Sequence, residues 1–190
     1  MQEYLSSTIT QFEYYKSLGE KSMNQIDEKQ WFIELNSNSN SIATIVKHLH
    51  GNMLSRWTDF LESDGEKEWR NRDGEFELEK VNPKDIVIWW EEGWQCLFDA
   101  LKNMNTEDLE QTVYIRNMGQ KAYEAINRQV AHYAYHIGQM VFLAKALKES
   151  EWESLSIPKG NSKIYNAQKF AQGKRTEHFS QEFLNKKGEQ

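Results

Sequence analysis

The sequence predicts an all-α protein built as a four-helix bundle, and three observations support this fold class. The chain has 190 residues but only two prolines, Pro83 and Pro158, so few positions interrupt a helix. Apolar residues recur at helical spacing in four long stretches. Clusters of turn-forming Asn, Ser, Asp and Gly separate these stretches. A bundle is the simplest way to bury four such apolar faces together.

The first two helices are separated by a polar loop. The first covers about residues 2–26, with an apolar stripe of Leu5, Ile9, Phe12, Tyr15, Met23 and Ile26. Residues 36–41 contain only Asn and Ser, which predicts a loop that ends in a helix cap. The second helix then runs to about Leu61, before Ser63-Asp64-Gly65 ends it. Residues 66–81 are charged and predict an irregular connection.

Asn82 and Pro83 mark the start of the third helix, with asparagine as the cap and proline at the first helical position. Residues 112–116 predict an extended segment and residues 117–119 a turn, so a small extended arm precedes the fourth helix, at about residues 121–148. Beyond it we expect a C-terminal tail with a short helix. The expected domains are a bundle over residues 1–155 and a tail over residues 156–190, which packs on the bundle or is partly disordered, with its short helix at residues 166–173.

Composition argues against several classes of protein. A net charge of −6 disfavours a nucleic-acid binder, whose surface would be basic. No apolar run approaches the length of a membrane span, and the first residues lack the basic start and apolar block of a signal peptide. Cys96 is the only cysteine, and we expect a passive core residue there. A single cysteine without an export signal fits a cytoplasmic protein.

Two histidines, His132 and His136, stand four residues apart in the fourth helix. Side chains with this spacing lie one above the other, so their imidazoles can bind one cation. A catalytic metal needs a third ligand. Each helical residue advances by about 100°. On this basis His48 lies at the polar border of the apolar face of the second helix, and His132 and His136 lie at the corresponding border of the fourth. His50 falls on nearly the opposite side, so His48 is the predicted third ligand.

Asn52 and Arg128 are the predicted catalytic residues, because each lies one turn from a predicted ligand on the same side of its helix. Either side chain could orient a substrate carboxylate or another bound oxygen. Arg128 could instead pair with Asp59, and the three histidines could simply hydrogen-bond to one another. The loop at residues 70–73 either covers the site or is held in place by salt bridges.

Two motifs resemble those of the DinB superfamily of YfiT-like four-helix metalloproteins. One is Ser41-Ile42-Ala43 followed by His48, and the other is His132-x-x-x-His136-x-Gly138-Gln139. The chain is also similar to a subgroup of proteins from Bacillus-like bacteria over most of residues 1–160. Segments with close counterparts in that subgroup are residues 51–60, 70–76, 126–129 and 156–158.

The resemblance implies a divalent metal, most often zinc or nickel, held by His48, His132 and His136 at the mouth of the bundle. It also implies a small-molecule substrate and an S-transferase that uses a low-molecular-weight thiol such as bacillithiol. A related hydrolase would activate water at the same ion. The alternatives are a non-catalytic bundle that binds a metal or small ligand, and a structural dimer.

The number of ligands favours an enzyme over these alternatives. A storage or structural metal site is usually closed by a fourth protein ligand, whereas a catalytic site keeps one position open. The sequence offers three matched histidines with polar neighbours and no evident fourth ligand. The aromatic-rich helices are also compatible with a homodimer.

Overall fold

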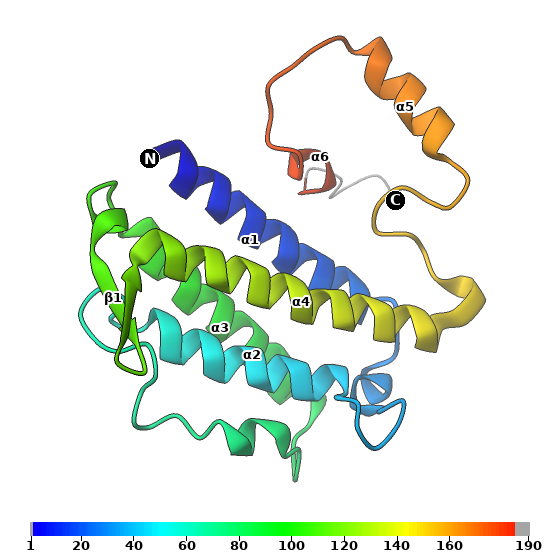
Figure 1. The fold of residues 1–190 in the computed structure, drawn as a ribbon. Coiled ribbons are helices and arrows are strands. Elements are labelled where there is room, and N and C mark those ends of the chain that lie inside the picture. Colours follow the sequence, from blue (N-terminus) through cyan, green and yellow to red (C-terminus); the bar gives the residue numbers. More distant parts are fainter. Residues whose placement is uncertain (1, 185–190) are drawn as a thin grey trace.

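The computed structural model describes residues 2–184, and it is mostly helical with one small two-stranded sheet. Figure 1 shows the long helices lying side by side, with the tail above them. The predicted preponderance of helix is confirmed. The long helices are α1 (Gln2–Met23), α2 (Ile42–Trp57), α3 (Pro83–Lys102) and α4 (Ala122–Lys148). Short 3-10 helices are η1 (Glu28–Phe32), η2 (Asp73–Phe76), η3 (Asp108–Glu110) and η4 (Glu149–Glu151).

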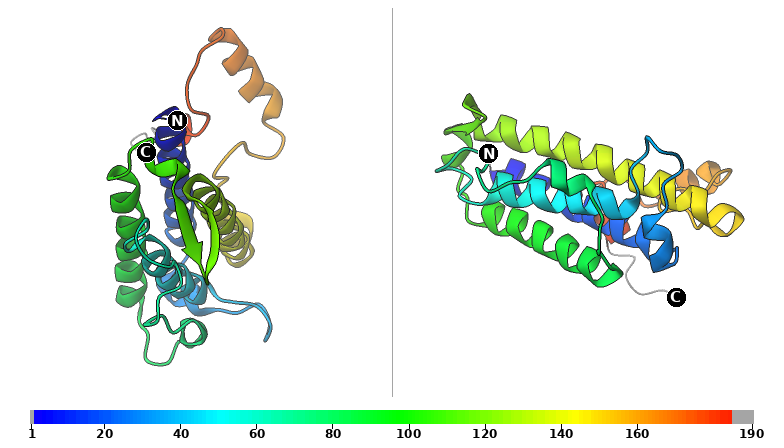
Figure 2. Two further views of the ribbon diagram at one scale, coloured as in Figure 1. Left: turned by 60° about the vertical axis from the view of Figure 1, so that its left-hand side comes forward. Right: turned by 90° about the horizontal axis from the view of Figure 1, so that it is seen from below.

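One hydrophobic core unites the four long helices. Helix α1 packs against α3 and α4, and α2 packs against the same two helices, as the views of Figure 2 also show. At the centre, the fully buried rings of Phe12, Trp94 and Tyr133 meet with centroids 5.7 to 6.4 Å apart. Tilted and edge-on aromatic contacts at such distances are favourable. The core therefore fastens α4, which carries two of the candidate ligands, to α1 and α3.

Helix α2 begins at the predicted cap and ends earlier than predicted. The Ser41 hydroxyl accepts a hydrogen bond from the backbone nitrogen of Thr44 at 3.1 Å, which satisfies one of the free amides of the first turn. The helix stops at Trp57 instead of about Leu61. The next residue, Thr58, is extended with a ψ of 124°, and Asp59 then has a φ of 47°, so neither residue continues the right-handed helix.

The arm before α4 is a hairpin of β1 (Thr112–Ile115) and β2 (Met118–Lys121), paired antiparallel. Its turn is formed by Arg116 and Asn117, one residue earlier than predicted. Both residues have positive φ, 56° and 60°, as the tight turn that fits the twist of two strands requires. The Asp64 carboxylate accepts hydrogen bonds from both backbone nitrogens at 2.8 Å. The loop after α2 thereby holds the hairpin in place.

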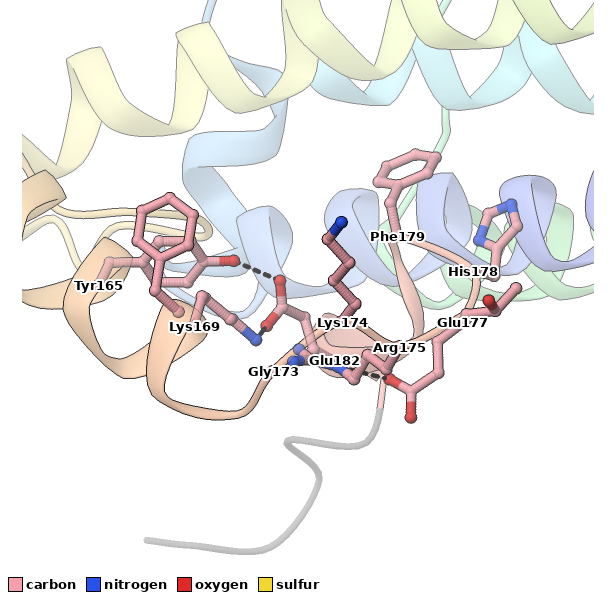
Figure 3. Close-up of a pocket in the computed structure, with 11 residues that line it drawn as sticks. Tyr165, Lys169, Gly173, Lys174, Arg175, Glu177, His178, Phe179 and Glu182 are labelled. Atoms are coloured by element: carbon pink, nitrogen blue, oxygen red, sulfur yellow. Dashed lines mark hydrogen bonds and ion pairs between the residues drawn. The ribbon is translucent and has the colours of Figure 1, made fainter.

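The tail contains α5 (Ser162–Ala171), which starts before the predicted residue 166, and α6 (Gln181–Leu184). Tyr14 of α1 contacts the rings of Phe179 and Phe183, with centroids 5.9 and 5.6 Å away, so this part of the tail packs on α1. Residues of the tail line a hollow of about 800 Å³, and Figure 3 shows their side chains. There the Glu182 carboxylate accepts hydrogen bonds from Tyr165 and Lys169.

Across residues 2–184, no helix combines the length and the apolar character that a membrane crossing needs.

Candidate metal centre

Three imidazoles converge between α2 and α4. Nε2 of His132 lies 3.1 Å from Nε2 of His136 and 3.5 Å from Nε2 of His48. One ligand atom from each of the three histidines lies within 4.8 Å of the others, so the cluster can hold a metal ion. Nitrogens bonded to one tetrahedral zinc ion at 2.0–2.1 Å would be about 3.3 Å apart. The two measured separations bracket that value.

The positions of the three residues follow from the packing of two helices. The spacing of His132 and His136 along α4 brings their ring centroids to 4.7 Å, and the contact of α2 with α4 adds His48. His48 is 5% exposed, and the other two are partly buried. The cluster is thus shielded on the α2 side and reachable from the α4 side.

Glu75 orients His48 from behind. Its carboxylate lies 2.8 Å from Nδ1 of His48, and it accepts two hydrogen bonds from Arg70, at 2.8 and 3.0 Å. Burial alone would raise the pKa of the Glu75 carboxyl, but the hydrogen bonds from His48 and Arg70 outweigh burial and lower it. An ionised carboxylate can only accept, so Nδ1 of His48 carries the hydrogen. A carboxylate behind a histidine is the usual way of holding a metal ligand.

Gly51 makes the approach of Glu75 possible. It lies on α2, next to the Glu75 side chain, and a Cβ atom at this position would overlap the Glu75 carboxylate. Glycine is unfavourable inside a helix relative to alanine by about 0.5–1 kcal/mol. Helix α2 therefore carries this cost at the one place where the carboxylate must come close.

His136 is the second candidate ligand with an orienting partner, since its Nδ1 lies 3.0 Å from Oε1 of Gln139. An amide oxygen accepts, so Nδ1 of His136 also carries the hydrogen. Both His48 and His136 then direct an Nε2 lone pair at His132. A single hydrogen on Nε2 of His132 can satisfy only one of them, whereas a cation at the centre would satisfy all three nitrogens.

Two of the three imidazoles, those of His132 and His136, have lowered pKa values. Burial, followed by the nearby His136 and His48, lowers the pKa of His132 to about 3. Burial and the neighbouring His48 lower the pKa of His136 to about 4. Neutral imidazoles are the form that binds metals. At neutral pH these two side chains already hold the required state.

Asn52, a predicted catalytic residue, is buried one turn beyond His48. Its Oδ1 accepts a hydrogen bond from the Tyr133 hydroxyl at 3.1 Å, and that hydroxyl accepts one from Nε1 of Trp57 at 3.0 Å. Tyr133 and Trp57 are buried residues of the hydrophobic core. Asn52 is therefore held by a buried hydrogen-bond chain beneath the histidines.

Arg128, the other predicted catalytic residue, is exposed on α4, one turn before His132. Among residues 2–184 no ion pair joins it to Asp59 or to another acid, so the alternative structural role has no contact to support it. Its guanidinium remains available on the same side of α4 as His132.

The loop before α3 both covers the cluster and is held by salt bridges, so the two predicted alternatives coexist. Arg70 pairs with Glu66 at 3.2 Å as well as with Glu75. Phe76 stacks on the His48 ring with a centroid distance of 5.3 Å, and the Arg72 guanidinium lies 5.5 Å from the Phe76 ring centroid. Salt bridges thus position a loop that closes the site beside His48.

Neither His50 nor Cys96 lies in the histidine cluster. His50 points to α3, where its Nε2 lies 3.1 Å from Glu92 and its ring stacks on Trp89 with centroids 6.1 Å apart.

Cys96 is half-buried instead of fully buried, and it lines a hollow of about 480 Å³ near Thr58. Burial raises the pKa of the Cys96 thiol, which makes it a poor nucleophile at neutral pH.

The comparison with protein families gives a match over most of the chain. A family model described as "Protein of unknown function (DUF1572)" matches residues 1–161. The chain belongs to this family. The DUF1572 match contains all three histidines together with Glu75 and Gln139, and it ends directly before α5. No curated protein and no solved structure matches the chain.

Proposed function

We propose that this DUF1572 protein is a four-helix bundle of the DinB type with one divalent metal ion, zinc or nickel, bound by His48, His132 and His136. The observation that carries the proposal is that Nδ1 of His48 and Nδ1 of His136 each contact an acceptor oxygen, at 2.8 and 3.0 Å. Glu75 and Gln139 each take an Nδ1 hydrogen, which leaves Nε2 lone pairs directed at a common centre. The hydrogen-bonded cluster without a metal leaves one of these lone pairs without a partner.

We further propose that the protein is an enzyme that transfers a low-molecular-weight thiol to a small electrophile. Three neutral imidazoles leave the charge of a divalent ion intact and at least one position open, which lowers the pKa of a thiol or water that binds there. In the transfer, the thiol sulfur forms a bond to an electrophilic carbon. The leaving group departs with its electron pair, and the thiol proton passes to solvent. Cys96, with its raised pKa, is not required as a nucleophile.

The surrounding residues have separate tasks in this proposal. Tyr133 occupies Oδ1 of Asn52, so the Asn52 amide nitrogen is the group that donates a hydrogen bond to a bound substrate. Arg128 is exposed and binds a carboxylate of the thiol, because a guanidinium matches a carboxylate in geometry and charge. A single cysteine also suits the reducing cytoplasm, where such thiols are kept reduced.

Metal analysis followed by an activity assay tests the proposal. Protein purified without chelator should contain about one zinc or nickel ion per chain, and His48→Ala should contain far less. The metal-loaded protein should join bacillithiol to chlorodinitrobenzene with release of chloride, and His50→Ala should retain this activity. If the protein contains the metal but converts neither thiol nor ester, the result would favour the alternative, a non-catalytic metal-binding bundle. Hydrolysis of an ester without thiol would favour the related hydrolase.

A further inference from the structure

A groove of about 650 Å³ lies beside the histidine cluster and is distinct from it. One wall is the loop before α2, from Leu35 to Asn40, and the other is the outer face of α4 from Tyr135 to Leu143. This volume is in the range that small organic ligands occupy. The groove is also open to solvent along α4, where Tyr135 and Phe142 are 64% and 65% exposed.

The groove is connected to the cluster through two residues of α4. Gln139 lines the groove and its Oε1 holds Nδ1 of His136 at 3.0 Å. Tyr135 lines it as well, and its ring centroid lies 5.1 Å from that of His136. A molecule in the groove is therefore separated from the candidate metal ligand by a single layer of side chains.

The lining of the groove contains no charge. Charged residues make up 27% of the chain, yet none of the eleven residues that line this groove is charged. The walls instead combine apolar side chains with amides, among them Phe142, Leu143, Asn36 and Asn40. An ion moved from water into such surroundings would lose hydration without gaining a partner. The groove therefore fits an uncharged molecule with an apolar or aromatic body and a few hydrogen-bonding groups.

Gly138 keeps the groove open. It is exposed in the middle of α4, and a Cβ atom there would meet nothing within 4 Å. A glycine in a helix costs stability relative to alanine, and packing gives no reason for it at this position. The empty space that it leaves belongs to the groove.

We propose that this groove binds the electrophilic substrate, and that the substrate is a neutral, largely apolar molecule. Its role as a substrate site rests on the function proposed above. The charged thiol would approach from the other side of the cluster, where Arg128 lies one turn before His132. The groove begins on the opposite side, at Gln139. The apolar body of the substrate would lie in the groove, and its electrophilic end would extend past Tyr135 and Gln139 to meet the thiol at the histidines.

Two fluorescent probes with the same ring system test the ligand class. Phenylnaphthylamine is neutral, and anilinonaphthalene sulfonate adds one negative charge. The neutral probe should bind the metal-free protein at least about tenfold more tightly than the sulfonate. Equal binding of the two probes, or tighter binding of the sulfonate, would overturn the assignment. Because no metal takes part, a failure of the proposed metal function leaves this result intact.

Gly138→Phe locates the binding site, and Ala146→Phe is its control. The first change adds a large ring at a groove position where a Cβ atom meets no neighbour within 4 Å, and it should abolish binding of phenylnaphthylamine. The control adds the same side chain at an exposed position of α4 outside the groove and should leave binding unchanged. Both variants should keep the wild-type circular dichroism and metal content. Unchanged probe binding in a folded Gly138→Phe protein would place the probe elsewhere and overturn the proposal.

A second variant tests the same site without blocking it. Phe142 is largely exposed, so Phe142→Lys should fold normally while adding a cation to the groove. The sulfonate should then bind at least as tightly as the neutral probe. A preference for the neutral probe that is as strong as in the wild type would show that Phe142 does not face the ligand, and would contradict the proposed site.

Discussion

Oε2 of Glu75 lies 2.8 Å from Nδ1 of His48, and this contact joins an irregular loop to the candidate metal centre. The loop contributes no ligand of its own. Its Glu75 carboxylate accepts a hydrogen bond from Nδ1 of His48. This contact fixes the tautomer of His48 and directs Nε2 at the other two histidines. Arg70, whose side chain is 2% exposed, holds the carboxylate in turn. The strength of metal binding should therefore depend on residues outside the ligand set.

Glu75→Gln should lower zinc affinity by about 10- to 100-fold, as is typical for the loss of such a partner. The amide keeps the shape of the side chain but removes the charge that favours an Nδ1 hydrogen on His48. Glu92→Gln is the matched control, because Glu92 makes the same kind of contact with His50 outside the cluster. Competition with a chelating dye measures both affinities. Equal affinity in the two variants would show that Glu75 only secures the loop.

Gly51→Ala should also weaken zinc binding, because the added methyl group displaces the Glu75 carboxylate from its place beside α2. Gly138→Ala is the control, since its methyl group enters open space on α4. The control should stabilise the protein by about 0.5–1 kcal/mol and leave zinc affinity unchanged. Urea unfolding and zinc titration of both variants provide the comparison. Full zinc affinity in Gly51→Ala would mean that Glu75 adjusts at little cost.

Acidification should destabilise the metal-free protein before most carboxylates are protonated. In the folded chain the pKa values of His132 and His136 are about 3 and about 4, against 6.5 for an ordinary histidine. Below pH 6.5 the unfolded chain takes up protons that the folded chain does not. The free energy of unfolding therefore falls as the pH drops from about 6.5 towards 4. Urea denaturation of the wild type and of a His132→Gln/His136→Gln variant should show the steeper fall in the wild type. Parallel curves would contradict the lowered pKa values.

Cys96→Ala should keep both metal content and transferase activity. The thiol lies in a different hollow from the histidines, and its raised pKa disfavours the thiolate. Since the side chain is half-buried, we expect a loss of about 1 kcal/mol or less in the free energy of unfolding. Metal analysis and the thiol-transfer assay check this. A folded variant with full metal content and no activity would identify Cys96 as a required nucleophile.

The helices could be predicted because apolar periodicity and local capping depend on neighbouring residues. Asn82 caps α3 because its Oδ1 accepts a 3.0 Å hydrogen bond from the backbone nitrogen of Lys84, two residues away. The predicted end of α2, at about Leu61, was wrong because Thr58 is extended and leaves the helix where the apolar pattern continues. Trp94 lies at the centre of the core. Only the packing of four helices shows that this ring is fully enclosed.

The candidate ligands could likewise be predicted from local sequence, whereas the residues that hold them in place depend on long-range packing. The three histidines could be chosen because angular position on a helix follows from spacing. Gln139 was visible in a motif, three residues after His136, but its hydrogen bond to that residue was not predicted. Glu75 could not be found, because it lies 27 residues from its partner His48 in an irregular, acid-rich connection. No local pattern there distinguishes one carboxylate from another.

His48 and His50 provide the sharpest test of the proposed ligand set. The two residues are close in sequence, yet His48 faces α4 and His50 pairs with Glu92 of α3. His48→Ala should reduce zinc affinity by more than about 100-fold, since loss of a ligand should exceed the loss of a supporting partner. His50→Ala should leave zinc affinity unchanged, because the contact of His50 with the exposed Glu92 side chain lies outside the cluster. Isothermal titration of both variants with zinc decides the matter. Strong loss in His50→Ala together with little loss in His48→Ala would place the metal between α2 and α3, and the proposed centre would be wrong.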